Sequence, residues 1–97
     1  MSVEQYKGYT FRYVQDNKAP GKIKVYVEQQ PSYGNRDTSV SIIHRWSGEN
    51  GSPPYICFKD EYKPSTLANA QRLARGWADK TDVYIRTGVS ISDQISR

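Results

Sequence analysis

The chain has 97 residues, of which 36% are hydrophobic and 25% are charged, with a formal net charge of +4 and a single cysteine. These values exclude several classes: a multidomain protein, an intrinsically disordered chain and a small domain held together by disulfides. We therefore expect one domain over residues 1–97, with a core from about residue 6 to residue 88 and a flexible tail over residues 89–97.

The sequence also argues against a membrane or secreted protein. No apolar run approaches the roughly 18 residues that a membrane-spanning helix needs. The first ten residues are polar and lack the apolar middle of a signal peptide. Since Cys57 has no second cysteine to pair with, a reducing compartment suits the chain. These features predict a cytoplasmic protein with no membrane association.

Alternating polar and apolar residues predict the first two strands. Residues 9–14 and 22–28 each alternate with period two, as strands with one buried face do. Between them, Pro20-Gly21 suits a type II turn, because glycine accepts the positive φ angle that this turn requires. The two runs therefore predict a β-hairpin. Its buried face is expected to carry Ile23, Val25 and Val27.

A second hairpin is expected after a polar loop over residues 29–38. Residues 39–46 (Ser-Val-Ser-Ile-Ile-His-Arg-Trp) are expected to form a third strand, and residues 55–59 a short fourth strand. The segment 47–54 between them is rich in turn-forming residues.

The strongest pattern lies in residues 67–85, where side chains suited to a core recur every three or four positions. Ser65 or Thr66 can cap the first amides of this segment, and Gly88 supplies a stop. The pattern therefore predicts one long amphipathic helix. Its buried stripe consists of Leu67, Ala70, Ala74, Trp77, Thr81 and Tyr84.

Strands followed by a helix, without alternation between the two, predict the α+β class. The expected fold is an antiparallel sheet of about four strands in two hairpins, packed on one face by a single C-terminal amphipathic helix. In the core, the sheet residues Ile23, Val25, Val27, Ile42, Ile56 and Phe58 should meet Leu67, Ala70, Ala74 and Trp77.

The sequence lacks the motifs of common catalytic and metal sites. It has one histidine, no Cys-x-x-Cys pair, no Gly-x-Ser-x-Gly and no phosphate-binding glycine motif. One candidate pair remains, because a hairpin with Trp46 opposite Tyr55 places His44 opposite Cys57, where the imidazole could activate the thiol. An isolated cysteine in a strand is more often a small buried hydrophobe. We therefore predict no enzyme activity, no cofactor and no metal.

A set of separated residues resembles the central part of prokaryotic ubiquitin-conjugating-like domains. The set consists of His44-Arg45, a glycine-rich turn, Cys57-Phe58, Trp77, Tyr84 and Thr87-Gly88. The resemblance covers less than half of the chain, and the N-terminal helix of that family has no counterpart in this sequence. The activity of that family is therefore not carried over to this chain.

Nucleic-acid binding is one of two binding functions that the sequence supports. The solvent face of the first hairpin should present cations and an aromatic ring, which suit phosphates and stacked bases. A sheet with one helix is also similar in layout to DNA-binding domains of the integrase-arm and plant AP2 types. The candidate residues are Arg12, Lys22, Lys24, Tyr26 and Arg45. Arg45 and Tyr55 extend the patch if the register of the second hairpin, which the sequence does not determine, places them on this face. Such residues are equally common on the wet face of any half-exposed sheet.

Protein binding is the other function, and the sequence favours it. The loop over residues 29–36 is long for a chain of this size and holds Tyr33 and Arg36, two residue types enriched at binding hot spots. The competing interpretation is an ordinary connection whose Tyr33 folds back onto the sheet. A net charge of +4 is modest for a protein that must hold phosphates.

The sequence thus predicts a non-catalytic protein-binding module. Small basic α+β proteins of this kind are common among regulators and inhibitors carried by phages and plasmids, which act by occupying the surface of a partner. Nucleic acid is the alternative partner. Either a monomer or a homodimer is consistent with the sequence, because an exposed outer strand could pair with a second copy.

Overall fold

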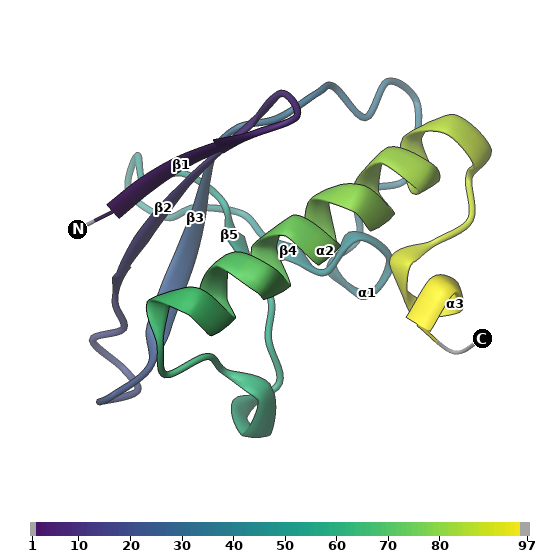
Figure 1. Cartoon of the computed structure of the whole chain (residues 1–97). Helices are drawn as coiled ribbons and strands as arrows, with labels where there is room; N and C mark the ends of the chain where they lie inside the picture. Colours follow the sequence, from purple (N-terminus) through teal and green to yellow (C-terminus); the bar gives the residue numbers. More distant parts are fainter. Residues whose placement is uncertain (1, 96–97) are drawn as a thin grey trace.

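The computed structural model describes residues 2–95 and consists of an antiparallel sheet with a long helix across one face (Figure 1). The strands are β1 (Ser2–Tyr6), β2 (Tyr9–Gln15), β3 (Ile23–Gln29), β4 (Arg45–Trp46) and β5 (Tyr55–Ile56), and their spatial order is β1-β2-β3-β5-β4. The helical segments are α1 (Val40–Ile43), the 3-10 turn η1 (Asp60–Tyr62), α2 (Leu67–Thr87) and α3 (Ile91–Ile95).

The predicted α+β class is confirmed, with five strands in place of four. The helix that covers the sheet is α2, as expected, although α1 and α3 add two short helical segments. None of the helices within residues 2–95 has the length and apolar character that crossing a bilayer requires.

The predicted first hairpin is confirmed as β2 and β3. Phe11 lies opposite Val27, and Tyr13 lies opposite Val25. All four side chains are at most 3% exposed, because this face of the sheet lies under α2. The alternation in the sequence thus identifies both the strands and the face that they bury.

The sequence pattern missed strand β1, which forms an outer edge of the sheet beside β2. Lys7 and Gly8 have φ angles of 49° and 89° and form the two-residue turn between these strands. Glu4 of β1 accepts hydrogen bonds from Tyr13 Oη and from Arg75 Nε of α2, both at 2.7 Å. Because polar side chains attach this strand to the helix, its sequence does not look like that of a strand with a buried apolar face.

The second hairpin is shorter than predicted. The sequence predicts strands over residues 39–46 and 55–59, but the structure has only β4 and β5, of two residues each. The first part of the expected third strand forms α1 instead. Trp46 lies opposite Tyr55, which is the register that the possible His44–Cys57 pairing requires.

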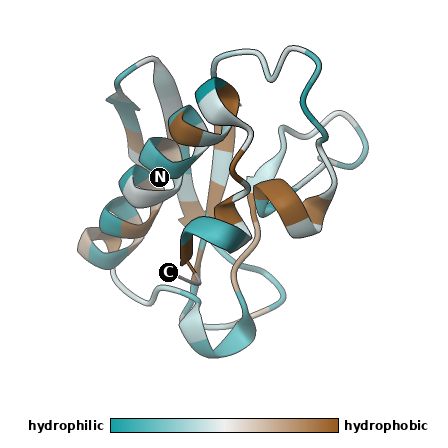
Figure 2. Cartoon of the chain, turned by 90° about the vertical axis from the view of Figure 1, so that its right-hand side faces the viewer, coloured by the Kyte–Doolittle hydropathy of each residue, from teal (hydrophilic) through white to brown (hydrophobic). Residues whose placement is uncertain are grey.

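Residues before α1 explain why a helix forms there. Asp37 Oδ1 accepts hydrogen bonds from the backbone N and the Oγ of Ser39, at 2.8 and 2.6 Å, which holds the chain in a turn just before the helix. Ile42 and Ile43 then both contribute to one hydrophobic cluster, and α1 is largely hydrophobic in Figure 2. Adjacent strand residues would point to opposite faces. At His44 the backbone enters the left-handed region, with a φ of 52°, and α1 ends.

Helix α2 has the predicted caps. Thr66 Oγ1 accepts a hydrogen bond from the backbone N of Asn69 at 3.1 Å, and Gly88 ends the helix with a φ of 80°. Leu67 is 39% exposed and does not join the core that the sequence assigned to it. The helix residues that do pack against the sheet are Ala70, Ala74, Trp77 and Ala78.

The segment after α2 differs from the expected flexible tail over residues 89–97. It forms α3, whose Ile91 is 2% exposed and belongs to the main core. The side chains of Ser92 and His44 are 2.8 Å apart and connect α3 to the region of α1. The burial of Ile91 and the hydrogen bond between Ser92 and His44 hold α3 against the rest of the chain. Residues 96–97 of the expected tail lie outside the described residues.

Two tyrosines under α2 donate hydrogen bonds to carboxylates. Tyr9 Oη donates to Asp82 Oδ1, and Tyr13 Oη donates to Glu4 Oε1, each at 2.7 Å. Burial raises the pKa of both phenols, and the adjacent carboxylate raises it further. Both phenols therefore stay protonated in the folded protein at a pH where an unfolded chain ionises them.

We expect the free energy of unfolding to fall as the pH rises above about 10, the pKa of tyrosine in an unfolded chain. Below that pH the folded and unfolded states both keep their phenolic protons, so the two tyrosines contribute their full stabilisation. Above it only the folded state keeps these protons, and the stabilisation is lost as the pH rises. Tyr13→Phe should reduce the mean slope of unfolding free energy against pH by about 0.7 kcal/mol per pH unit between about pH 9 and pH 11, half of the limiting value for one proton, as measured by urea titration. The control is Tyr62→Phe, because Tyr62 is 65% exposed. Equal slopes in Tyr13→Phe and the parent would contradict this account.

Candidate functional site

The register of the sheet aligns one side chain from each strand on the face opposite α2. Directly paired residues of antiparallel strands point to the same face, so consecutive pairs across the sheet form one line. Neighbouring strands are about 4.8 Å apart, so four spacings give a line of about 19 Å. We call these residues the open-face row. From one edge of the sheet to the other, they are Val3, Arg12, Tyr26, Tyr55 and Trp46.

Cations lie against the aromatic rings in the middle of this row. The guanidinium carbon of Arg12 is 4.5 Å from the centroid of the Tyr26 ring. Lys24 Nζ is 5.0 Å from the same centroid and 4.0 Å from that of Tyr55. The two tyrosine rings meet edge to face, with their centroids 6.1 Å apart. Arg12 also forms an ion pair with Glu28, which offsets part of the positive charge.

Trp46 ends the row at the edge of the sheet. Its side chain is 47% exposed, whereas Val3 at the other end is 62% exposed. The sequence analysis did not identify Trp46 as a site residue. The available signal was the possible pairing of Trp46 with Tyr55, since that pairing places the two rings on the same face.

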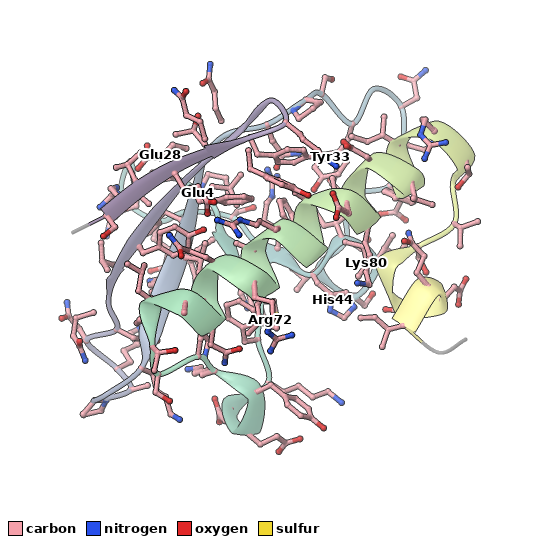
Figure 3. The ribbon with its side chains drawn as sticks, viewed as in Figure 1. Glu4, Glu28, Tyr33, His44, Arg72 and Lys80 are labelled. Carbon is pink, nitrogen blue, oxygen red and sulfur yellow. The ribbon has the colours of Figure 1, made fainter. Side chains whose placement is uncertain are left out.

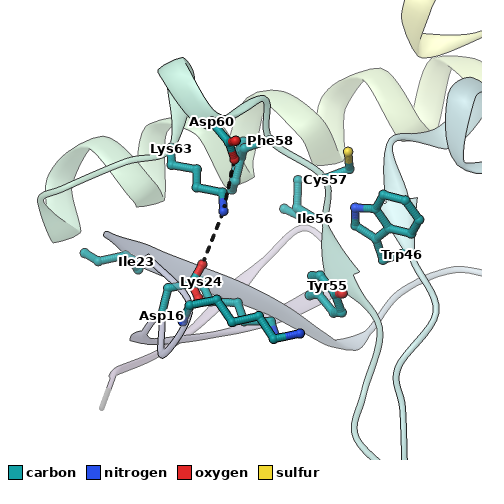
Figure 4. A pocket seen from close by; sticks show the side chains of 11 residues that line it. Asp16, Ile23, Lys24, Trp46, Tyr55, Ile56, Cys57, Phe58, Asp60 and Lys63 are labelled. Atoms are coloured by element: carbon teal, nitrogen blue, oxygen red, sulfur yellow. Dashed lines mark hydrogen bonds and ion pairs between the residues drawn. The ribbon is translucent and has the colours of Figure 1, made fainter. Parts of the chain in front are cut away.

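Two hollows adjoin the row. One of about 270 Å³ lies between β3 and the chain that follows β5, and Trp46 and Tyr55 stand at one side of it (Figure 4). The other, of about 230 Å³, lies beside the loop 47–54. Lys18, Lys24 and Tyr55 line both hollows. Cations and rings therefore continue from the row into concave surface on either side of Tyr55, where Asp16 and Asp60 line one hollow and Glu49 lines the other.

The structure brings together three of the residues predicted to bind nucleic acid. Arg12 and Tyr26 belong to the open-face row, and Lys24 lies against it. Lys22 lies in the turn before β3, where its backbone N donates to the carbonyl oxygen of Ala19 at 3.0 Å. The predicted patch is thus centred on the middle strands of the sheet.

Arg45 is separated from this patch. It lies opposite Ile56, whose side chain is 4% exposed and belongs to the core under α2. The guanidinium of Arg45 donates to Gln30 Oε1 at 2.7 Å and lies 5.2 Å from the centroid of the Tyr33 ring. The pairing with Ile56 therefore puts Arg45 on the α2 side of the sheet, whereas the sequence analysis placed it with the solvent-facing cations.

The loop that suggested protein binding folds against the end of α2. Tyr33 is 9% exposed, and its ring packs against that of Tyr84 with the centroids 6.3 Å apart. Arg36 is exposed and donates from Nε to the carbonyl oxygen of Ile85 at 3.3 Å, where the last carbonyls of a helix attract a cation. Tyr33 therefore serves a second hydrophobic cluster with Ile43 and Tyr84. Tyr33 thus folds back, as the competing interpretation expected, but it packs against α2 and not against the sheet.

His44 and Cys57 lie opposite each other, because Trp46 is paired with Tyr55. The backbone N of Cys57 donates to the carbonyl oxygen of His44 at 2.8 Å. The imidazole itself bonds elsewhere: Ser92 Oγ donates to the carbonyl oxygen of Ser41 at 2.6 Å, so it accepts from His44 Nε2 at 2.8 Å. Burial, followed by the charge of Lys59, lowers the pKa of His44. The ring is thus neutral and held by a serine, and the absence of a catalytic role stays a prediction.

The acidic, histidine and cysteine side chains of residues 2–95 form no cluster of three or more that could hold a metal ion. No protein family, curated protein or solved structure matches the chain in the comparisons with known proteins. Its function therefore has to be inferred from its own geometry, and the open-face row is the feature with the most distinctive chemistry.

Proposed function

We propose that this protein binds single-stranded nucleic acid across the open face of its sheet, with little sequence preference. The observation that carries the proposal is the open-face row, in which Tyr26, Tyr55 and Trp46 follow one another on adjacent strands. Every base has a flat face that can stack on such rings. Arg12 and Lys24 beside the rings supply the positive charge that phosphates require.

Three aromatic rings on the open face of the sheet favour a single strand over a duplex. In a duplex the bases are already stacked on one another and offer a protein only their edges in the grooves, whereas the bases of a single strand are free to stack on side chains. The three rings extend over two strand spacings, about 10 Å, and could accept roughly three bases, one on each ring. In the free protein Lys24 rests on two of these rings, and binding would move its ammonium group to a phosphate and free the ring faces.

The sequence favours a protein partner over nucleic acid, whereas the open-face row favours nucleic acid over a protein partner. The case for a protein partner depended on Tyr33 and Arg36, and both side chains contact α2 within the molecule. The open-face row could also receive a protein partner, because Trp, Tyr and Arg are enriched at protein-binding hot spots. Salt dependence and the nature of the ligand separate the two functions.

We expect Trp46→Ala or Tyr55→Ala to weaken the binding of a fluorescein-labelled oligothymidine by roughly 5- to 150-fold. One stacked base contributes about 1–3 kcal/mol, which corresponds to that range. Arg12, Lys18 and Lys24 could neutralise three phosphates, so the logarithm of the association constant should fall with the logarithm of salt with a slope of about −2. Fluorescence anisotropy at several salt concentrations measures both quantities.

Tyr62→Ala is the matched control, since this tyrosine is 65% exposed on η1 and lies outside the row. It should bind with parental affinity. If the parent gives no anisotropy change at low salt, or if Trp46→Ala binds as tightly as the parent, the proposal is wrong and a protein partner becomes the better assignment for the open face. Tighter binding of a duplex of the same length would contradict the preference for a single strand.

A further inference from the structure

A separate pocket lies on the α2 side of the sheet, between α2, α3 and the chain that follows β5. Its volume is about 240 Å³. Apolar side chains from both helices line it, among them Leu73, Trp77 and Ile91. His44, Arg72 and Lys80 also line it, and Figure 3 shows all three on the same side of α2. We call this cavity the α2–α3 pocket.

The charged groups of the α2–α3 pocket have one sign. None of the residues that line it is acidic. Arg72 donates only to a neutral amide oxygen, Asn69 Oδ1, at 2.6 Å, and Lys80 Nζ forms no ion pair with any carboxylate in residues 2–95. On another face of the same helix, Arg75 is neutralised by Glu4. The pocket is therefore lined by one lysine and one arginine that form no ion pair within the described residues.

We infer that the α2–α3 pocket binds a small apolar carboxylate, with the hydrocarbon part against Leu73 and Trp77 and the carboxylate at Lys80. Arg72 is eight residues, about 12 Å, before Lys80 along α2 and adds positive charge at longer range. Charge complementarity requires an anion, and the apolar lining requires a hydrocarbon part that displaces water from it. A phosphate, which carries more charge, would lose more hydration on entering an apolar pocket than a carboxylate does. This site is distinct from the open-face row and does not rest on the proposed function.

The volume limits the size of the ligand. Liquid water occupies about 30 Å³ per molecule, so about 240 Å³ corresponds to about eight waters. That space suits a single ring or a short branched chain and is smaller than the pockets that hold drug-sized molecules. Benzoate, a single ring with one carboxylate, is therefore the probe for this site, and benzamide is its neutral counterpart of nearly the same shape.

Two side chains of the pocket report on binding. Trp77 Nε1 donates to the carbonyl oxygen of Ile43 at 2.9 Å, so its indole signal in nitrogen–proton NMR spectra responds to a ligand in the cavity. Cys57 also lines the pocket and is partly exposed, so a bound ligand should slow its alkylation by iodoacetamide. We expect benzoate to shift the Trp77 indole signal in a saturable way and to slow alkylation, and benzamide to do neither.

Lys80→Gln should weaken benzoate binding roughly tenfold, as expected for the loss of a charged hydrogen-bond donor. Arg72→Gln should act in the same direction. Arg86→Gln removes the same charge from an exposed position near the end of α2 and should stay within about twofold of the parent. Circular dichroism of each variant establishes that the fold is kept.

Four outcomes would overturn the inference. They are the absence of any shift of the Trp77 indole signal at saturating benzoate, equal effects of benzamide and benzoate, displacement of benzoate by an equal concentration of inorganic phosphate, and parental affinity of both Lys80→Gln and Arg72→Gln. The second would show that charge plays no part, and the third would show a simple anion site. Because no nucleic acid is present, failure here leaves the test of the open-face row unaffected.

Discussion

Trp77→Ala is expected to lower the free energy of unfolding by about 3–5 kcal/mol, a large part of the 5–15 kcal/mol that stabilises a typical natural protein. The indole is 5% exposed and meets the rings of Tyr9 and Phe11 edge-on, with centroids 5.9 and 6.2 Å away. Truncation would remove these contacts and leave a cavity between α2 and the sheet. The carbonyl oxygen of Ile43 would also lose its hydrogen-bond donor.

Thermal unfolding followed by circular dichroism measures this effect. At about 4–8 °C for each kcal/mol in a chain of this size, the midpoint should fall by roughly 12–40 °C. Trp77→Phe separates packing from hydrogen bonding, because it keeps an aromatic ring but leaves Ile43 without a donor, at a cost of about 1–3 kcal/mol. A loss below about 1 kcal/mol for Trp77→Ala would show that the indole is not a central part of the core.

Gly48→Ala is expected to destabilise the protein by about 2–3 kcal/mol and to disturb the pairing of β4 with β5. A Cβ atom at this position would overlap the carbonyl oxygen of Ser52 and lie 2.6 Å from that of Pro53. Both obstacles are backbone atoms of the same loop, so they can yield only if the turn opens. Trp46 lies two residues away, and we therefore expect the variant to lose affinity for the oligothymidine as well.

Gly76→Ala provides the matched control for this substitution. Gly76 lies inside α2, and a Cβ atom there would meet only Lys80 Nζ, at 3.8 Å. Alanine should therefore stabilise the helix by about 0.5–1 kcal/mol, the opposite sign. Urea titration of both variants tests the pair. Equal stability of Gly48→Ala and the parent would mean that the loop rearranges at no cost.

Local patterns predict the parts of this fold that depend on neighbouring residues. The caps of α2 at Thr66 and Gly88 were readable from the sequence, and so was the alternation that buries Val25 and Val27. The α1 segment was also readable in principle, since Asp37 and Ser39 are typical of a chain entering a helix. Its apolar residues instead matched the expectation of a strand.

Other features depend on contacts between distant parts of the chain. Tyr33 is buried because α2 brings Tyr84 beside it, and no pattern within the loop indicates this. The face occupied by Arg45 depends in the same way on its pairing with Ile56. For the candidate site, alternation correctly placed Lys24 and Tyr26 together, whereas the exposure of Trp46 required the whole sheet. Sequence patterns therefore predict Lys24 and Tyr26 at the centre of the candidate interface but not Trp46 at its edge.

The two parts of the sheet, β1-β2-β3 and β5-β4, are paired over a short length. β3 and β5 share a single pair of residues, Tyr26 and Tyr55, whereas β2 and β3 are paired along six positions. The short hairpin of β4 and β5 can therefore open as a local unit while the three longer strands stay folded. Amide hydrogens of β4 and β5 should exchange with deuterium faster than those of β2. A ligand lying across Tyr26 and Tyr55 would hold the two parts together, so its binding should slow exchange most in the hairpin that contributes Trp46.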